Sequence, residues 1–445
     1  MSYASATGGR TVTLNTGTIS NFENLIGSSY GDVLTGDGGN NVIEGGLGND
    51  TLDGGAGADT ASYAFSTGAV TASLATGTAS GAEGNDTLSN FENLAGSSYN
   101  DTLTGDASAN VIDGGAGDDL IDGGGGADTL RGGSGTDTLS YASLGAGVTV
   151  TLNTSDSNGA TLAGFENVIG SVYADTITGD AFANTIDGGA GNDTLDGGGG
   201  VNTVSYASAS SAVTVDLSSA GVNATGGGGS DQLSNFSNII GSAYADTLTG
   251  DGGANLLEGG LGADTFDGGA GTDTASYANS GGAVTVSLLA GATNTGWDAA
   301  GDVFVRSGAY STVENLIGSS YGDTLTGDSG ANAIDGGAGN DTIVGGAGAD
   351  TLTGGAGIDT LSYASATGGI TANLTSYRGV NQGAAYSGYG GANDAQGDIV
   401  SGFENLTGSA YNDALMGSTD NNVLTGGGGN DLMWGDAGND TLYAN

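Results

Sequence analysis

A nine-residue unit repeats through this chain in almost unbroken register. One clear copy reads Gly-Gly-Leu-Gly-Asn-Asp-Thr-Leu-Asp at residues 45–53, and the next copy follows directly at residues 54–62. Twenty-six such units occur, and most fit the pattern G-G-x-G-x-D-x-U-x, in which U is apolar. Glycine reaches positive φ and allows tight turns, whereas the x-U-x stretch is long enough only for a short strand. We therefore expect two successive units to form one flattened coil with a turn on each side.

The apolar slot of the unit predicts how these coils pack. In the first block the slot holds Leu34, Ile43, Leu52 and Ala61. If each of these side chains points inward, every coil stacks its apolar residue on that of the next. The sequence therefore predicts an all-β chain, a parallel β-roll or β-solenoid of stacked 18-residue coils, with wider coils and loops between the blocks.

The units fall into six blocks of four or five. The block tyrosine and the next Ser-Tyr-Ala tyrosine are Tyr30 and Tyr63 in block one but Tyr99 and Tyr141 in block two, so their separation grows by one whole unit. A solenoid tolerates such insertions because each repeat contacts only its neighbours. We expect one continuous solenoid, 1–445, made of blocks 1–62, 63–140, 141–205, 206–276, 277–362 and 363–445.

The recurring Asp points to a metal. It returns with every second unit on the same side of the predicted coil, next to turn carbonyls. Calcium takes six to eight oxygen ligands from carboxylates and carbonyls in tolerant geometry, whereas magnesium demands a stricter octahedron. The same Asp is also an ordinary turn residue, so solvated turn carboxylates are the alternative.

The pattern resembles the RTX, or haemolysin-type, calcium-binding family over most of the chain. The resemblance implies a right-handed β-roll that holds many calcium ions, each between successive turns and bound by Asp side chains and main-chain carbonyls. It also implies secretion through a type I system. The Asp residues that match the ligand slot are Asp32, Asp50, Asp59, Asp101, Asp119, Asp128, Asp137, Asp175, Asp193, Asp246, Asp264, Asp273, Asp323, Asp341, Asp350, Asp359, Asp413, Asp431 and Asp440.

The first two units of each block depart from the pattern. The first reads Gly-Ser-x-Tyr-x-Asp-x-U-x, and the second places Asn in the Asp slot. These Asn turns either bind calcium more weakly or hold the coil by hydrogen bonds. In block three both Asn184 and Asn202 lack charge, so we expect the poorest site there. The Asn residues are Asn41, Asn110, Asn184, Asn255, Asn332 and Asn422.

Two further elements connect the blocks. Asn-Phe-Glu-Asn-Leu-Ile at residues 21–26 recurs before each block, and we expect its Phe to plug the core, while Glu23 is either a ligand or a solvated edge. A Val-Thr-Val strand recurs at Val148, Val213 and Val284 and predicts a wider, half-buried coil. The segments after it vary in length. Their aromatic and cationic residues, which are candidates for contact with cell-surface or matrix partners, are Trp297, Phe304, Arg306, Tyr310, Tyr377, Arg378, Tyr386 and Tyr389.

The composition couples folding to metal. The formal charge is −46, with 94 glycines and no Pro, Cys or His. Such a chain repels itself and loses much entropy on folding, so without a cation it should be disordered. Calcium binding and folding are then one event. Extracellular calcium modules work at about 10⁻⁴–10⁻³ M, so we expect a secreted, extracellular or cell-surface protein.

Composition also excludes much chemistry. Without His or Cys there is no Ser-His-Asp triad, Cys-His dyad or zinc-protease motif, and we expect no enzyme activity. The charge argues against nucleic acid as a partner. No apolar run is long enough to span a membrane.

The leading functional hypothesis is structural. The chain starts and stops at about the same repeat position, Met1-Ser2-Tyr3-Ala4 and Leu442-Tyr443-Ala444. Copies stacked head to tail would build an extracellular filament, surface layer or biofilm matrix. The alternative is a repeat-region fragment of a giant RTX adhesin. An ice- or ligand-binding module is a third hypothesis, but the third slot is usually Ala or Gly rather than Thr.

Overall fold

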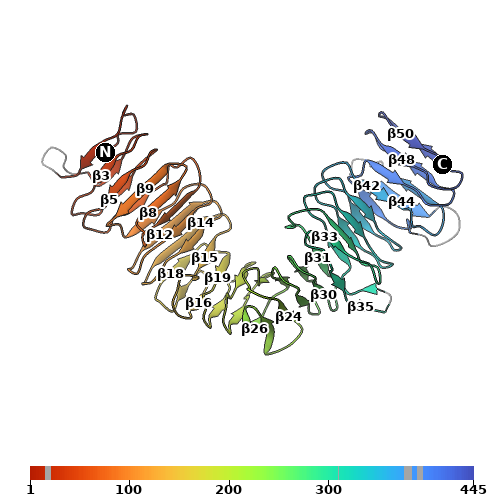
Figure 1. Ribbon diagram of the computed structural model, residues 1–445, viewed down its shortest axis with the longest axis horizontal. Helices are drawn as coiled ribbons and strands as arrows, with labels where there is room; N and C mark the ends of the chain where they lie inside the picture. The colour runs from red at the N-terminus through yellow and green to blue at the C-terminus, as the bar shows by residue number, and fades with distance from the viewer. Residues whose placement is uncertain (16–21, 309, 375–382, 388–393, 445) are drawn as a thin grey trace. The chain divides into compact units, whose positions relative to one another are not determined.

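The computed structural model describes residues 1–15, 22–308, 310–374, 383–387 and 394–444. The regular elements of these residues are strands, most of them three residues long, and include no helix (Figure 1). No helix in this part of the chain is therefore long and apolar enough to cross a membrane. The prediction of an all-β chain of short stacked strands is confirmed. Two compact units are distinguished: one contains residues 1–205 and 228–236, and the other contains residues 206–227 and 237–445.

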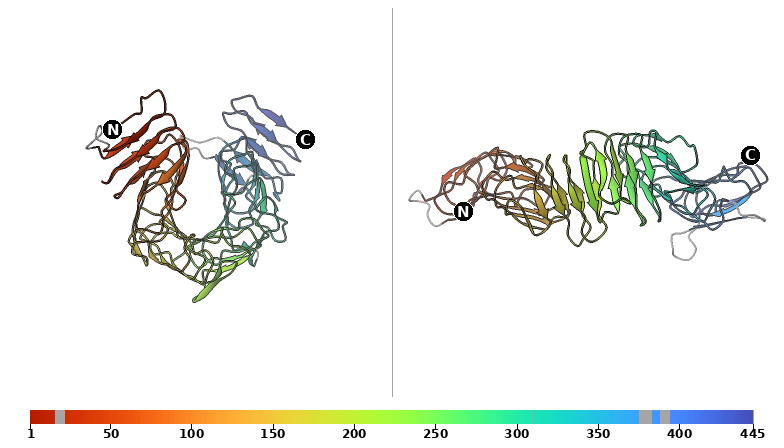
Figure 2. Two further views of the ribbon diagram at one scale, coloured as in Figure 1. Left: turned by 60° about the vertical axis from the view of Figure 1, so that its left-hand side comes forward. Right: turned by 90° about the horizontal axis from the view of Figure 1, so that it is seen from below.

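Strands pair in parallel with the strand two repeat units further along, which is one coil of the predicted length. Leu34 of β3 (Val33–Thr35) lies opposite Leu52 of β5 (Thr51–Asp53). Ile43 of β4 (Val42–Glu44) lies opposite Ala61 of β6 (Thr60–Ser62) in the other sheet. Successive nine-residue units thus alternate between two sheets, which are seen as stacked strands in Figure 2.

In the first unit one sheet follows the order β1 (Thr11–Thr13), β3, β5, β9 (Gly84–Ser89), β8 (Thr78–Gly81), β7 (Val70–Ser73), β11 (Thr102–Thr104), β13 (Leu120–Asp122), β15 (Thr138–Ser140), β19 (Asn167–Ile169), β21 (Thr185–Asp187) and β23 (Thr203–Ser205). The other follows the order β2 (Asn24–Ile26), β4, β6, β10 (Asn93–Ala95), β12 (Val111–Ala116), β14 (Thr129–Ser134), β18 (Thr161–Ala163), β17 (Ser155–Asp156), β16 (Thr149–Thr151), β20 (Thr176–Thr178), β22 (Thr194–Asp196) and β26 (Gly229–Ser234).

In the second unit one sheet runs β27 (Asn238–Ile240), β29 (Leu256–Glu258), β31 (Thr274–Ser276), β37 (Asn315–Ile317), β39 (Ala333–Asp335), β41 (Thr351–Thr353), β45 (Ile399–Ser401), β44 (Gly383–Ser387), β43 (Ile370–Asn373), β47 (Ala414–Met416) and β49 (Leu432–Trp434). Another series contains β25 (Val222–Gly226), β24 (Val213–Asp216), β28 (Thr247–Thr249), β30 (Thr265–Asp267) and β34 (Val303–Phe304). A further series runs β33 (Thr295–Gly296), β32 (Val284–Ser287), β38 (Thr324–Thr326), β40 (Thr342–Val344), β42 (Thr360–Ser362), β46 (Asn405–Thr407), β48 (Val423–Thr425) and β50 (Thr441–Tyr443), and β35 (Arg306–Ser307) pairs with β36 (Tyr310–Ser311).

The wider coil between blocks contains antiparallel strands. In the first block β7 turns back into β8 and β8 into β9, so that β9 pairs with β5 on one side and β7 pairs with β11 on the other. The predicted Val-Thr-Val strands are confirmed, and they begin these meanders. Because units alternate between sheets, the five-unit second block moves the next meander, β16–β17–β18, to the other sheet.

The core is a column of apolar-slot residues. Leu34, Ile43, Leu52 and Ala61 are all fully buried. The Phe segment also packs inward in five copies, at Phe91, Phe165, Phe236, Val313 and Phe403. Phe22 is the exception, with 42% of its surface exposed.

Candidate metal sites

The candidate ligands lie in the turns that connect the two sheets. Asp50 directly precedes β5, and its turn contains Gly46 at φ +84° and Gly48 at φ +130°. Side-chain-bearing residues rarely adopt such backbone angles, which explains the glycines at these two slots. The turn geometry that the G-G-x-G-x-D pattern requires is therefore present.

Carboxylates of successive coils are joined by a backbone ladder. Oδ1 of Asp50 accepts the N–H of Asp32 at 2.7 Å. Likewise, Oδ1 of Asp119 accepts the N–H of Asp101 at 2.8 Å, and Oδ1 of Asp137 accepts that of Asp119 at 2.9 Å. The structure thus brings together the slot residues that lie one coil apart.

The second carboxylate oxygen is the unusual feature of these turns. In ten of the predicted ligands Oδ2 is buried and accepts no hydrogen bond. A buried polar group without a partner costs free energy, and a buried charge costs more unless an opposite charge balances it. A cation supplies that balance. The ten are Asp50, Asp59, Asp119, Asp137, Asp193, Asp264, Asp273, Asp341, Asp350 and Asp359.

Carbonyl oxygens approach the same carboxylates. A Cβ added to Gly114 would stand 2.3 Å from Oδ2 of Asp119 and 2.5 Å from the carbonyl oxygen of Gly132, one coil further on. The missing side chain thus leaves a space bordered by two oxygens from successive coils. No group of three or more acidic side chains in the described residues is arranged to hold a metal by itself. Carboxylate and carbonyl oxygens together are the ligands that calcium prefers, so the residues present fit this ion.

The burial of these carboxylates also changes their acidity. Desolvation raises the pKa of Asp50 to about 7, and the neighbouring charges of Asp86 and Asp32 add to the increase. Desolvation raises the pKa of Asp264 to about 8, with a contribution from Asp302. Without a cation, these groups therefore hold protons near neutral pH.

The other nine predicted ligands fall into two groups: six have a Ser donor in their own turn, and three make through Oδ1 the same ladder bond as the ten. Asp32, Asp101, Asp175, Asp246, Asp323 and Asp413 all accept hydrogen bonds from a Ser in their own turn. Asp128 accepts the N–H of Asn110, Asp431 that of Asp413, and Asp440 that of Asn422, at 2.9 to 3.0 Å.

The Asn slots are held by hydrogen bonds. Oδ1 of Asn110 accepts the N–H of Asp106 at 2.9 Å, and its amide donates to the carbonyl of Glu92 at 2.8 Å. In block three Oδ1 of Asn202 accepts the N–H of Asn184 at 2.9 Å. Hydrogen bonding, one of the two roles that the sequence left open for Asn, is therefore present at these residues.

Sequence reasoning missed the acids of the wide coils. Asp86 accepts the N–H of Asp50 at 2.9 Å and so continues the ladder beyond the last regular unit. The available signal was the order Asp86-Thr87-Leu88, which repeats the D-x-U spacing of the unit. The equivalents in other blocks are Asp231, Asp302 and Asp398, which accept the N–H groups of Asp193, Asp264 and Asp350.

The Glu of the Phe segment extends the ladder on the opposite side of the coil. Oε2 of Glu92 accepts the N–H of Asp59 at 2.8 Å. The same bond at the same distance joins Glu166 to Asp137, Glu314 to Asp273 and Glu404 to Asp359. These Glu residues are thus neither free nor fully solvated.

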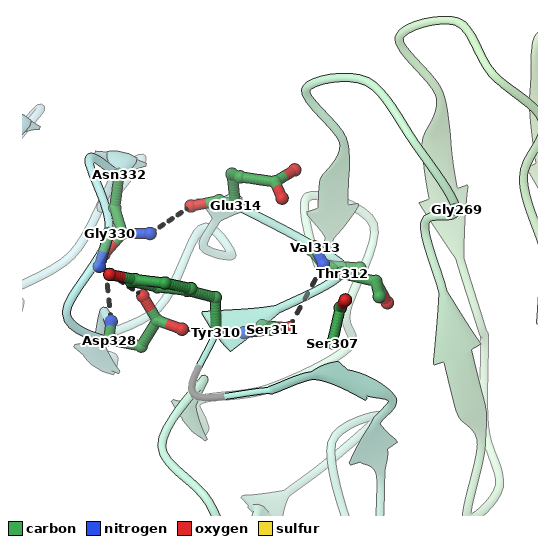
Figure 3. A pocket seen from close by; sticks show the side chains of 10 residues that line it. All are labelled: Gly269, Ser307, Tyr310, Ser311, Thr312, Val313, Glu314, Asp328, Gly330 and Asn332. Atoms are coloured by element: carbon green, nitrogen blue, oxygen red, sulfur yellow. Dashed lines mark hydrogen bonds between the residues drawn. The ribbon is translucent and has the colours of Figure 1, made fainter.

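The variable segments of the second unit combine exposed and packed residues. Trp297 and Tyr310 are more than half exposed, whereas Phe304 is buried and stacks on Phe266 with ring centroids 5.4 Å apart. Arg306 forms an ion pair with Asp328 at 3.6 Å. Tyr310 and Asp328 both border a hollow of about 300 Å³ (Figure 3). Tyr377, Arg378, Tyr389 and the side chain of Tyr386 lie outside the described residues.

Comparison with protein families agrees with this geometry. The model of the RTX calcium-binding nonapeptide repeat matches residues 26–61, 90–121, 105–139, 169–204, 240–275, 311–343, 326–361 and 407–442, which is more than half of the chain. No curated protein matches the chain significantly. The strands, glycine turns and Asp ladder of each matched segment are those described above. The chain therefore belongs to the RTX calcium-binding nonapeptide repeat family.

Proposed function

We propose that this chain is a secreted calcium-binding structural protein that folds when it meets extracellular calcium. One observation carries the proposal: ten Asp carboxylates bury an oxygen that receives no hydrogen bond. Each such turn needs a cation or a proton before its coil can close.

The charge of the chain supports the same conclusion. Fifty acidic residues face only four basic ones, so the chain holds few internal cations. In the described residues Arg131 and Arg306 form the ion pairs found, with Asp113 and Asp328 respectively. Neither pair includes one of the ten carboxylates. Where these carboxyls are not protonated, the positive charge must come from outside the chain, and the extracellular medium supplies calcium at the required concentration.

Circular dichroism tests the proposal directly. At pH 8 the chelated chain should give a disordered spectrum, and millimolar calcium should restore the β signal cooperatively. Magnesium should largely fail, because its octahedral geometry and tightly held water suit these carbonyl-rich turns poorly. A full β spectrum at pH 8 in excess chelator would contradict the proposal.

We extend this proposal to assembly by head-to-tail stacking into a filament, surface layer or biofilm matrix. The apolar slot is fully buried at Leu424, but Leu442 of β50 is 45% exposed. Leu432 and Trp434 of β49 are also about half exposed or more. These strands each pair with one neighbour, β48 or β47. A further coil stacked on them would bury the slot and pair the open edge.

The opposite edge offers the partner surface. Along a strand, residues whose backbone groups bond to one neighbour alternate with residues whose groups point the other way. The carbonyl of Arg10 and the N–H of Leu14 both bond to β3. The backbone groups of Thr11 therefore point away from β3, toward the open edge. Calcium added to the monomer should raise light scattering and give unbranched fibres. Thr11→Pro removes an outward donor and should reduce assembly, whereas Thr11→Val should not.

The alternative is that further repeats of a longer adhesin cover the same edges. The discriminating result is the state of this chain in solution. If it stays monomeric by light scattering at millimolar calcium and high protein concentration, head-to-tail assembly fails. The calcium-folding proposal is unaffected by that outcome, because it depends on the turns and not on the edges.

A further inference from the structure

The turns of this chain differ in whether protein donors reach both oxygens of their Asp carboxylate. We call a turn closed when both oxygens have donors and open when one has none. The residue at the second position of the unit, Ser or Gly, goes with this difference. In the opening turn of block two, the N–H of Ser97 donates to Oδ2 of Asp101, and its Oγ–H donates to Oδ1 at 3.0 Å. Both carboxylate oxygens therefore have protein donors. The same pair of bonds recurs in all six blocks, at Ser28, Ser97, Ser171, Ser242, Ser319 and Ser409.

One coil later the second position is glycine and the turn stays open. Gly115 has φ +105°, an angle that a residue with a side chain such as Ser rarely adopts, and Oδ2 of Asp119 receives no donor. A Cβ at Gly115 would stand 2.2 Å from the carbonyl oxygen of Ser97, so Ser cannot replace this glycine in place. The choice of Ser or Gly thus decides whether the carboxylate is satisfied within its own turn.

The second turn of each opening coil is also closed by protein groups. Figure 3 shows this turn in block five, where the amide of Asn332 donates to the carbonyl of Glu314 at 2.6 Å. Oδ1 of Asn332 accepts the N–H of Asp328 at 2.9 Å, and Oδ1 of Asp328 accepts that of Gly330 at 2.7 Å. The uncharged Asn therefore needs no cation, and both ends of the opening coil are satisfied.

The wide coil that follows the regular units of a block also contains an Asp with donors on both oxygens. Oδ1 of Asp86 accepts the N–H of Asp50, and Oδ2 accepts the hydroxyl of buried Tyr63 at 3.1 Å. Tyr277 donates to Asp302 at 2.7 Å and Tyr363 to Asp398 at 2.8 Å. In these three blocks, the open carboxylates lie between an opening coil and a wide-coil Asp whose two oxygens both have protein donors, whereas Oε2 of Glu83 in the first wide coil is buried without a donor.

We propose that calcium is required only by the turns that combine glycine at the second position with Asp in the Asp slot, and that the opening coils and the wide-coil Asp residues that accept a Tyr hydroxyl close without metal. Serine at the second position acts as an internal substitute for the ion. The inference rests on the proposed calcium-binding function and narrows it, because the number of ions then follows the turns that have both this glycine and Asp, rather than every Asp slot. Calcium-dependent coils are thereby interleaved with calcium-independent ones within each block.

A matched pair of substitutions tests the proposal. Asp101→Asn keeps one oxygen for the N–H of Ser97 and should leave the number of bound ions unchanged, although its NH2 group then replaces the oxygen that accepts the N–H of Val70. Asp119→Asn removes a ligand and should lower the number by at least about one. Bound calcium is counted by mass spectrometry of the metal after dialysis against millimolar calcium, with circular dichroism to confirm folding.

The outcomes distinguish failure of the division between open and closed turns from failure of calcium binding itself. Equal losses in Asp101→Asn and Asp119→Asn would overturn the division of the turns while leaving calcium binding intact. A wild-type chain without bound calcium would overturn the proposed function itself.

A gain of binding tests the role of Ser97 independently. The double substitution Ser97→Gly with Tyr99→Gly restores the G-G-x-G-x-D order in front of Asp101 and should add about one ion. Ser98→Gly, at the neighbouring variable position, is the control and should add none. An unchanged count in the folded double variant would contradict the role given to serine.

Discussion

The hydroxyl of Tyr277 offers a clean test of how a wide coil is held. It donates to Oδ2 of Asp302 at 2.7 Å, and both side chains are only 3% exposed. Oδ1 of the same carboxylate accepts the N–H of Asp264 at 2.9 Å. Tyr277→Phe removes the hydroxyl but keeps the ring, which packs edge-on against Phe266 at 6.5 Å. The substitution therefore isolates a single hydrogen bond.

The expected loss follows from the burial of the acceptor. A hydrogen bond to a charged group contributes about 1.5–3 kcal/mol, and the carboxylate is left without this partner in the variant. Since about 1.4 kcal/mol corresponds to a factor of ten, local opening of this coil should become roughly 10- to 150-fold more frequent. The amide of Asp264 reports it, because its acceptor is the same carboxylate.

Hydrogen exchange measured by mass spectrometry at pH 8 and saturating calcium is the appropriate assay. A peptide that contains Asp264 should lose protection by the stated factor in Tyr277→Phe. Tyr244→Phe is the control, because that side chain is 46% exposed, and its exchange should match the wild type. Unchanged protection of Asp264 in folded Tyr277→Phe would refute the reasoning and show that another group holds Asp302.

Three further predictions concern acidity, glycine and the core. Burial raises the pKa of Asp50 to about 7 and that of Asp264 to about 8, from 3.8 for an exposed Asp. Between about pH 4 and 8 the folded chain without calcium therefore binds more protons than the unfolded chain, so its stability increases as pH falls. Its β signal by circular dichroism should therefore rise as pH falls from 8 to 5, while the calcium midpoint rises because protons compete with the ion; constant values would contradict this. Gly115→Ala places a Cβ 2.2 Å from a carbonyl oxygen at φ +105°, so it should raise the calcium concentration at which half of the chain is folded. Gly252→Ala, which has open space around it, is the control and should not raise it. Equal midpoints in the two variants would contradict the turn geometry. Leu257→Ala truncates a fully buried slot residue and should lower the free energy of unfolding by about 2–5 kcal/mol. Hydrogen exchange should show lost protection in β29 and its neighbours β27 and β31 but not in distant coils, and a uniform loss along the chain would contradict this.

The register of the coils could be predicted from the sequence because it depends on residues within one nine-residue unit. Glycine at positions 45, 46 and 48 fixes a turn, and the alternation of Thr51, Leu52 and Asp53 fixes one short strand with one inward side chain. Repetition then converts this local preference into a stack of coils, each two units long. Insertion of one whole unit could also be predicted, since the spacing between tyrosines changes by the length of a unit.

The candidate site could be predicted only in part. The sequence places Asp101 and Asp119 in the same slot and shows Ser97 and Gly115 at the second positions of their units, but it does not show what this difference does to the two carboxylates. Their difference arises from the hydrogen bonds of Ser97 and the backbone angle of Gly115, which position the donors in space. Phe22 was likewise expected to pack like its copies, but it is 42% exposed in the structure.

By itself, the sequence determined the all-β class, the length of the coil, the apolar column and the recurring Asp slot, because each follows from a short repeated pattern. Only the tertiary structure decided which oxygens lack partners and how the wide coils close. Tyr63 and Asp86 are well separated in the sequence and meet only after β7, β8 and β9 have folded back on one another. Contacts of that kind depend on strand pairing across segments without a period, and no local pattern encodes them.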